Sequence, residues 1–235
     1  MTSASGNVAA VIVAAGKASR FGGNQKKQYA SLGGRTVLAQ TLMTFDRCGR
    51  IDEVFLVVSR EDRDLCQEAV LTPCSFHKPI HLITGGVDRQ ESVYKGLEAT
   101  EGRFEFVLIH DGVRPFVTND MIDGCMEQVG KRGACVVAEP IPDTVKRVDE
   151  TDRIVSTVDR SNLRLAQTPQ AFRYQLIWKA HVAAAREGYR GTDDAQLVER
   201  LGATVVTVPG SRKNIKITTR EDLEIANRLL GNRSL

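Results

Sequence analysis

The sequence of 235 residues lacks the features that mark several classes of protein. Its five cysteines are odd in number and contain no C-x-x-C pair, so we expect reduced cytosolic thiols or core side chains, with no disulfide framework or zinc site. The net charge is only +3, with basic and acidic residues interleaved, which argues against a nucleic-acid surface. The first apolar run is too short to span a bilayer, and no basic residue precedes it. We therefore expect a cytoplasmic protein with no membrane anchor or signal peptide.

Two glycine-rich phosphate motifs are also missing from the first loop. The apolar run 8–15 predicts a buried strand that ends at Gly16. A dinucleotide fingerprint would need glycines at positions 18 and 21, where the chain has Ala18 and Phe21. A Walker A loop would need Gly-Lys-Ser/Thr at positions 21–23, where the chain has Phe-Gly-Gly. Any phosphate bound here must rely on cationic side chains.

Such cations are present in the same loop, which carries Lys17, Arg20, Lys26 and Lys27 among small residues. Charged runs are usually solvated surface. Here they follow a buried strand, however, and a cationic loop in that position can present charge to a polyphosphate. Arg20 and Lys27 are the leading candidates.

Strand-like runs alternate with helix-period segments along the rest of the chain. The further strand runs are 54–58, 80–83, 106–109, 135–138, 204–208 and 215–217, and the helical segments are 36–46, 61–71, 90–99, 119–130, 174–187, 193–201 and 220–230. This alternation predicts a Rossmann-like α/β fold over residues 1–235, with a largely parallel central sheet flanked by helices. Thr218 and Glu221 predict a capping box for the last helix. Motifs that follow strands should converge, because ligands collect at the carboxyl ends of such strands.

Residues 143–160 break the alternation. They consist of two β-rich runs joined by a polar turn at 149–152. An isolated hairpin is marginally stable in water, so this one must pack on something. It could form an extra edge of the same sheet or an arm that grips a second subunit, and the residues alone leave both open.

Two motifs indicate binding sites, one for a nucleotide and one for a metal ion. Gly85 and Gly86, at a strand end, permit close approach of the backbone to a planar ligand. Ser92 offers a hydroxyl for a base edge, or a simple helix cap. Asp111 directly follows a buried strand and could ligate Mg²⁺ or another divalent cation together with substrate phosphates. Arg114 could pair with Asp111 or reach a substrate anion.

Three further candidate residues lie beside predicted turns or within a predicted strand. Thr168 and Thr192 offer hydroxyls beside sharp turns, although Thr192 also suits a helix N-cap. Lys216 lies between Ile215 and Ile217 in a predicted strand, so alternation turns it to the opposite face, where it would be a fixed cation at a crevice.

No histidine receives a catalytic role. His110 is expected to be buried and hydrogen-bonded, and Pro79 disfavours a metal pair between His77 and His81. His181 has no evident partner. Clustered cations and a carboxylate suit nucleotidyl transfer, which proceeds mainly by positioning and charge stabilisation. A phosphate acceptor is largely dianionic at pH 7 and needs no general base.

Taken together, these motifs resemble those of a specific family, the 2-C-methyl-D-erythritol 4-phosphate cytidylyltransferases of the non-mevalonate isoprenoid pathway. The matching segments are AAGKASRFGGNQKKQY, GGVDRQESVYKGL, HDGVRPF, PIPDTVKRVD, TVDRSNL, QTPQAF, TDDAQLVE and NIKITTREDL. They occur in family order from Val8 to about Leu230. The resemblance implies attack by methylerythritol 4-phosphate on the α-phosphorus of CTP, with release of pyrophosphate.

The resemblance also implies a homodimer in which a β-arm, residues 140–162, embraces the partner. Arg20 and Lys27 would stabilise the transition state on the CTP phosphates. Ala14, Ala15, Gly16, Gly85, Gly86 and Ser92 would hold the cytidine, with Asp111 near the ribose and the metal. Lys216, Asp111, Arg114, Thr168 and Thr192 would hold the acceptor. Arg160 and Thr144 would reach it in the partner's site.

Several positions depart from the family pattern. They are Ala18, Lys26, Val87, Gly112, Val113 and Arg164, where a glycine, a proline, an acidic residue, two alanines and a tryptophan are common. None removes a proposed catalytic cation. Three alternatives follow: a ribitol-5-phosphate cytidylyltransferase, a CTP-binding module without catalysis, and a Rossmann dehydrogenase, which the missing glycines disfavour.

Overall fold

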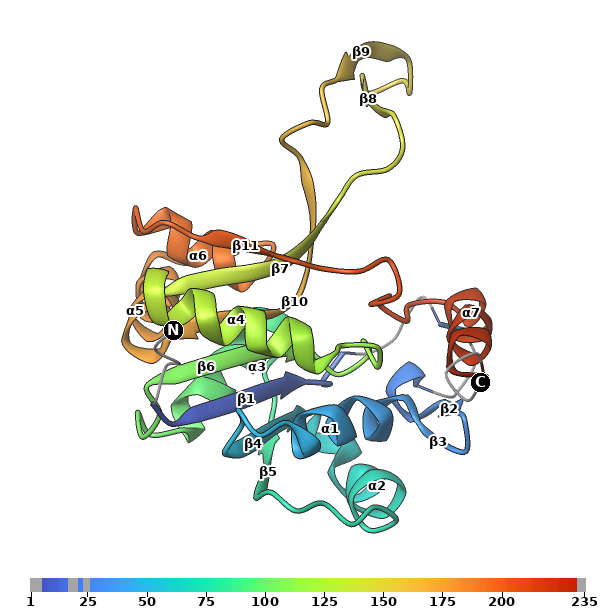
Figure 1. The fold of residues 1–235 in the computed structure, drawn as a ribbon, viewed down its shortest axis with the longest axis vertical. Coiled ribbons are helices and arrows are strands. Elements are labelled where there is room, and N and C mark those ends of the chain that lie inside the picture. The colour runs from blue at the N-terminus through green and yellow to red at the C-terminus, as the bar shows by residue number, and fades with distance from the viewer. Residues whose placement is uncertain (1–5, 17–20, 23–25, 232–235) are drawn as a thin grey trace.

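The centre of the molecule is a seven-stranded sheet. The computed structural model describes residues 6–16, 21–22 and 26–231. The strands lie in the order β11-β7-β10-β6-β1-β4-β5 (Figure 1). Their bounds are β1 (Val8–Val13), β4 (Glu53–Val58), β5 (Ile80–Thr84), β6 (Phe106–Asp111), β7 (Ala134–Pro140), β10 (Arg164–Arg173) and β11 (Val206–Pro209). All neighbouring pairs are parallel except those of β10, which is antiparallel to both β6 and β7. The predicted α/β fold is confirmed.

Helices cover both faces of this sheet. They are α1 (Val37–Arg47), α2 (Arg63–Cys66), α3 (Arg89–Ala99), α4 (Asn119–Arg132), α5 (Tyr174–Glu187), α6 (Asp194–Arg200) and α7 (Arg220–Gly231). Strand β1 shows why two layers form, since its alternate residues face opposite ways. Ala10 and Ile12 join the core with α1 and α4, whereas Ala9 and Val11 join the core with α3, α5 and α6 (Figure 1).

Two strand predictions differ from the structure. The segment 165–172, in which Thr168 was expected beside a turn, lies inside β10. A proline is unfavourable in a central strand, but the pairing with β7 shifts register between Ala166 and Gln170, which accommodates Pro169. The strand predicted at 215–217 is wrong. In the described structure this segment pairs with no strand, and its Ile217 N–H donates to Val113 O.

Two helix caps are displaced by one residue from their predicted positions. Helix α6 is capped by Asp193, whose carboxylate accepts from the Gln196 N–H, and not by Thr192. Thr219 and Asp222 form the reciprocal cap of α7 in place of Thr218 and Glu221. Helix α7 begins at Arg220, as predicted, and α6 begins at Asp194, one residue after its predicted start. The shift is small because the neighbouring side chain has the same capping chemistry.

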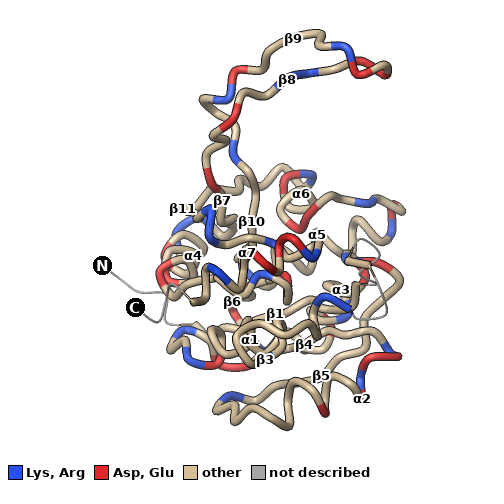
Figure 2. Tube along the Cα trace, turned by 90° about the vertical axis from the view of Figure 1, so that its right-hand side faces the viewer, with Lys and Arg blue, Asp and Glu red and all other residues tan. Residues whose placement is uncertain are grey.

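The hairpin at 143–160 forms an arm that extends away from the sheet. Strands β8 (Val145–Val148) and β9 (Ile154–Val158) pair only with each other in the described structure, beyond the ends of β7 and β10 (Figures 1 and 2). The first alternative, an extra edge of the central sheet, is therefore wrong. Among the described residues, no helix combines the length and apolar character needed to cross a bilayer.

The order of the strands fixes where a ligand can bind. The chain leaves β1 toward β4 and β5 on one side, and β6 then pairs with β1 on the other side. The loops after these strands diverge at this reversal, which opens a crevice at their carboxyl ends. The short hairpin of β2 (Ser31–Leu32) and β3 (Arg35–Thr36) and helix α7 lie beside it (Figure 1).

Candidate functional site

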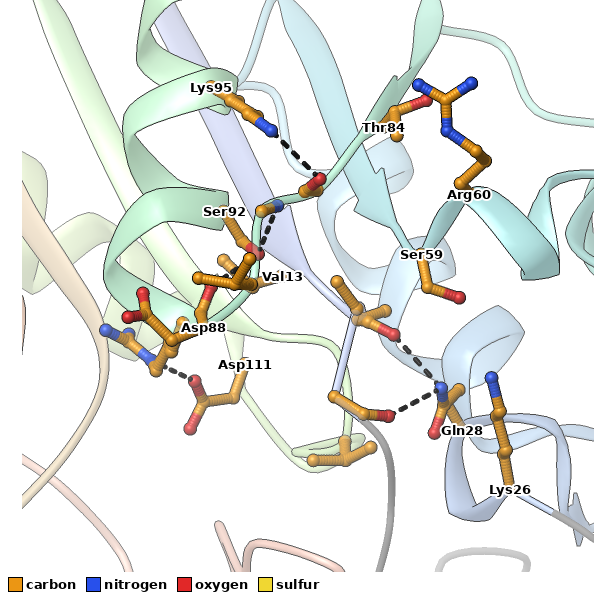
Figure 3. A pocket seen from close by; sticks show the side chains of 18 of the residues that line it. Val13, Lys26, Gln28, Ser59, Arg60, Thr84, Asp88, Ser92, Lys95 and Asp111 are labelled. Carbon is orange, nitrogen blue, oxygen red and sulfur yellow. Dashed lines mark hydrogen bonds and ion pairs between the residues drawn. The ribbon is translucent and has the colours of Figure 1, made fainter.

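A cavity of about 550 Å³ occupies this crevice. Its walls come from the segments that follow β1, β4, β5 and β6 (Figure 3). The predicted residues that line it are Ala14, Ala15, Gly16, Lys27, Gly85, Gly86, Ser92, Asp111 and Lys216. The expectation that motifs after strands converge is thus confirmed for these nine. Arg20 lies outside the described residues.

Close packing explains the paired glycines on one wall. A Cβ at Gly85 would lie 2.7 Å from Ala15 Cβ and 2.9 Å from Ser92 Oγ, so no side chain fits without displacing them. Ser92 is not a helix cap, since Asp88 caps α3 by accepting from the Glu91 N–H at 2.8 Å. Its hydroxyl accepts from the Gly86 N–H at 3.1 Å and donates to Asp88 O at 2.7 Å. Ser92 therefore holds the glycine turn in shape, and a ligand would meet the turn itself.

The opposite wall carries Lys27. It begins a 3₁₀ turn, Lys27–Tyr29, directly before the β2–β3 hairpin. The next residue, Gln28, is buried, and its amide donates to Ala14 O at 3.0 Å and to Gly16 O at 3.4 Å, so the turn is bonded to the end of β1 (Figure 3). The preceding residue, Lys26, contacts both carboxylate oxygens of Asp62 at 2.7 and 2.8 Å.

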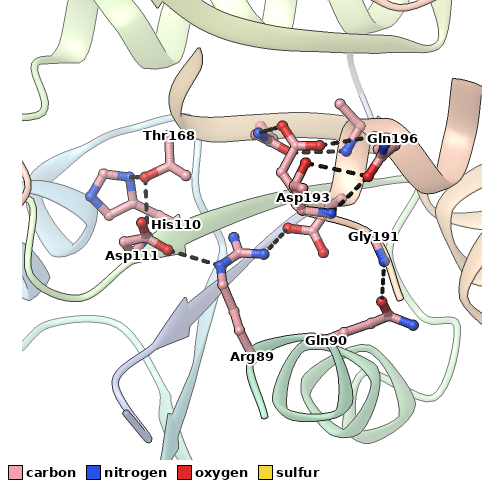
Figure 4. A network of polar contacts seen from close by, with 12 residues as sticks. Arg89, Gln90, His110, Asp111, Thr168, Gly191, Asp193 and Gln196 are labelled. Carbon is pink, nitrogen blue, oxygen red and sulfur yellow. Dashed lines mark hydrogen bonds and ion pairs between the residues drawn. The ribbon is translucent and has the colours of Figure 1, made fainter. Parts of the chain in front are cut away.

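Asp111, at the end of β6, is surrounded by cations. Arg89 Nε lies 3.1 Å from Oδ1, Lys216 Nζ lies 2.8 Å from Oδ2, and Arg114 Nε lies 3.7 Å from Oδ2 (Figure 4 shows the Arg89 contact). Burial opposes ionisation of this carboxyl. The charges of Arg89, Lys216 and Arg114 outweigh that effect, so the pKa of Asp111 is held far below its usual value. Asp111 is thus a permanent anion that organises three cations.

A magnesium site at Asp111 is not favoured by this arrangement. Both carboxylate oxygens already accept from cations, which would repel a further dication. Within the described ranges, no group of three His, Cys, Asp or Glu side chains could hold a metal ion. The role of Asp111 as a metal ligand stays a prediction that its surroundings argue against.

Three predicted acceptor residues lie outside the walls of the cavity. The Thr168 hydroxyl is buried, accepts from the Asp111 N–H at 3.1 Å and contacts His110 Nδ1 at 3.0 Å (Figure 4). Thr192 is exposed beside Gln196. Arg114 donates to Asn214 O at 2.7 Å, which fixes the segment that carries Lys216. These positions support the site from behind or beside it.

Thr144 and Arg160 lie farther away. Both are exposed and belong to the arm, Thr144 just before β8 and Arg160 just after β9. Neither lines the cavity of its own chain. A role in catalysis would require a second copy of the chain.

Sequence reasoning missed a chain of polar contacts that runs from Arg89, in the cavity wall, into the interior (Figure 4). Arg89 Nη1 donates to Asp194 Oδ2 at 2.8 Å, and Asp194 Oδ1 lies 3.2 Å from His181 Nε2. The sequence showed no evident partner for His181, and the structure supplies Asp194. Asp194 and His181 are each 1% exposed, so the charges are well shielded from water. The D-R pair after the glycines was the available signal for Arg89, but its partners lie far along the chain.

Sequence reasoning also missed two cations that line the cavity. Arg60 follows β4, and Lys95 lies on α3, where its Nζ contacts Gly85 O at 3.3 Å and Glu91 Oε1 at 3.2 Å (Figure 3). Together with Lys26, Lys27, Arg89 and Lys216 they outnumber the acidic residues of the lining, which are Glu61, Asp88 and Asp111. A polyanionic ligand suits this wall.

Residues 8–232 match the family described as 2-C-methyl-D-erythritol 4-phosphate cytidylyltransferase. The chain belongs to this family. The chain is similar to the proteins of that name from Caldanaerobacter subterraneus subsp. tengcongensis, with 44% identity over 95% of this chain and 99% of that one, and from Geobacter metallireducens, with 45% identity over 93% and 95%. The resemblance drawn from the sequence is confirmed, and the chain is an enzyme of the cytidylyltransferase class.

A solved structure agrees with this assignment. The 4-diphosphocytidyl-2C-methyl-D-erythritol synthase from Anaerococcus prevotii superposes with a TM-score of 0.85 at 33% identity, and the match covers 96% of this chain and 98% of that one. This structural match and the family match both extend over nearly the whole chain, so the two comparisons support the same assignment.

Proposed function

We propose that this cytidylyltransferase transfers the cytidylyl group of CTP to 2-C-methyl-D-erythritol 4-phosphate, giving 4-diphosphocytidyl-2-C-methyl-D-erythritol and pyrophosphate. The observation that carries the proposal is the cavity itself. One wall is a glycine turn suited to a planar base, and the other walls present Lys27 and the cations around Asp111. Family membership supplies the identity of the two substrates.

The reaction needs stabilisation of charge and no general base. A phosphate oxygen of the acceptor attacks the α-phosphorus of CTP, and the bond from that phosphorus to the bridging oxygen of the β-phosphate breaks. Lys27, with Arg20, neutralises negative charge that builds on the nucleotide phosphates. Lys216, held by Asp111, binds the acceptor phosphate. His110 does not act as a base, since it is fully buried and burial lowers its pKa to about 4.

We infer that magnesium enters as part of the substrate, bound to the triphosphate of CTP. This fits a site with many cations and a single buried carboxylate, because Mg²⁺ commonly binds substrate phosphates together with few protein oxygens. Lys27 and Lys216 then bind the phosphate oxygens that the ion leaves free.

We also propose a cytoplasmic homodimer. The arm carries exposed apolar side chains that a partner would cover, namely Val148, Ile154 and Val155, and Leu163 and Leu165 are exposed just after it. Arg160 and Thr144 on the arm would complete the acceptor site of the partner. The cytoplasmic location is supported by all five cysteines being free thiols.

The test is an acceptor comparison. The protein, CTP and Mg²⁺ are incubated with methylerythritol 4-phosphate or with ribitol 5-phosphate, and pyrophosphate release is followed. We expect release with the first acceptor and little with the second. Turnover with ribitol 5-phosphate alone would move the assignment to that relative, and CTP binding without release for either acceptor would favour a non-catalytic module.

A further inference from the structure

We propose that Lys26 and Asp62 form an anchor that holds Lys27 in the cavity, so that Lys26 is a positioning residue and not a phosphate ligand. The inference rests on the proposed function only for what Lys27 does once it is held there. Lys26 and Lys27 are adjacent, both basic and both line the cavity, yet their surroundings give them different tasks.

The ion pair itself is short, and its carboxylate is shielded from water although the Lys26 side chain is 32% exposed. Lys26 Nζ lies 2.7 Å from Asp62 Oδ1 and 2.8 Å from Oδ2, and the Asp62 side chain is only 6% exposed. In the part of the chain that the structure describes, both hydrogen bonds to this carboxylate come from Lys26. Asp62 is fixed in turn by its N–H, which donates to Ser59 O at 3.1 Å in the 3₁₀ turn Arg60–Asp62 that follows β4.

The backbone around Lys27 is held on both sides. Before it, Lys26 is tied to the β4 side of the cavity through Asp62. After it, Gln28 is 1% exposed and its amide is bonded to Ala14 O, at the end of β1 (Figure 3). The Tyr29 N–H closes the turn by donating to Lys26 O at 3.0 Å. Lys27 therefore projects from a short segment that two neighbouring strands hold in place.

Electrostatics keeps Lys26 on Asp62. A move of the Lys26 ammonium toward a bound phosphate would leave a buried carboxylate without its cation, which is strongly unfavourable. The Lys26 charge is already balanced by Asp62, so the pair adds little net charge to the cavity. We therefore assign the substrate phosphates to Lys27, which lines the cavity beside this pair.

A double-mutant cycle tests the anchor. Lys26→Met, Asp62→Asn and the double variant are compared for kcat/KM with respect to CTP and for CTP affinity by calorimetry without acceptor. We expect each single variant to lose about tenfold and the double variant to lose about tenfold as well, because all three break the same pair. The KM for the acceptor should stay within about twofold, since Lys216 and Arg89 are untouched.

Conservative and surface variants complete the design. Asp62→Glu keeps the charge and should retain most of the activity. The exposed pair Lys131–Glu127, with Nζ 2.6 Å from Oε1, gives the matched control, and Lys131→Met with Glu127→Gln should change nothing. Thermal melts establish that each variant is folded, and Lys26→Met at a partly exposed position tests the anchor even if Asp62→Asn does not fold.

Two results would overturn the proposal. The first is additivity, in which the double variant loses about a hundredfold. The second is tighter CTP binding by Asp62→Asn, which is expected if the freed Lys26 is itself a phosphate ligand. The calorimetric cycle measures CTP affinity and needs no acceptor. It therefore tests the anchor even if the protein does not transfer the cytidylyl group to methylerythritol phosphate and the proposed function is wrong.

Discussion

Lys216 Nζ lies 2.8 Å from Asp111 Oδ2, which joins the segment before α7 to the end of β6. The Asp111 carboxylate also accepts from Arg89, which Asp194 holds from the other side. One buried anion therefore organises the cations at this end of the cavity. Lys27 lines the same cavity.

Asp111→Asn should lower turnover by about a hundredfold or more, because Lys216 and Arg89 lose the charge that orients them. It should also destabilise the fold by about 3–5 kcal/mol, since the cations stay partly buried without a counter-charge. Steady-state kinetics and urea unfolding measure the two effects. Near-normal turnover in a folded variant would reject the organising role of Asp111.

Lys27→Ala should lower kcat by about two to three orders of magnitude with little change in the unfolding midpoint, because the lost charge acts mainly in the transition state. Arg20→Ala should behave in the same way. Lys131→Ala, on an exposed face of α4, is the control and should keep full activity. The charge-stabilisation role fails if both cavity variants turn over normally.

Asp194→Asn should destabilise the protein by about 3–5 kcal/mol and raise the acceptor KM, since it leaves Arg89 without its second partner. Glu187→Gln, which breaks the exposed bridge to Arg200 at 2.9 Å, should cost about 0–1 kcal/mol. Chemical unfolding of both variants gives the comparison. Equal effects would mean that the buried network contributes no more than a surface pair.

Acid should weaken the fold partly through His110. Burial lowers its pKa from 6.5 to about 4, so between these values the unfolded chain binds a proton that the folded protein does not. Stability therefore rises with pH across this window, and acidification from pH 7 to 4.5 should remove about 2 kcal/mol through this residue. Urea midpoints of wild type and His110→Gln should converge toward pH 4.5. Parallel curves would contradict the assignment.

Mixing two inactive variants tests the arm. In the proposed dimer each site uses Lys27 of one subunit and Arg160 of the other. Lys27→Ala and Arg160→Ala, co-refolded in equal amounts, should regain about a quarter of wild-type activity, because half of the dimers are mixed and one site in each is intact. No recovery from verified mixed dimers would exclude a shared site.

The sequence predicted the sheet, most helices and nine of the cavity residues, because buried strands and the glycines, lysines and aspartate after them are local signals. It did not predict β10, whose central proline obscures the strand pattern. It also missed Arg89 as the partner of Asp194, since only the packing of α3 beside α6 brings these charges together. Lys216 was predicted as a site residue from strand alternation, yet its position depends on Asp111 and not on a strand.

The most direct test of the account follows the α-phosphorus. CTP labelled at the α-phosphate is incubated with the enzyme, Mg²⁺ and methylerythritol 4-phosphate, and the products are separated. The account predicts that the label enters a diphosphate joined to the acceptor in step with pyrophosphate release. Label that stays in CTP, or that appears only as CMP, would contradict it.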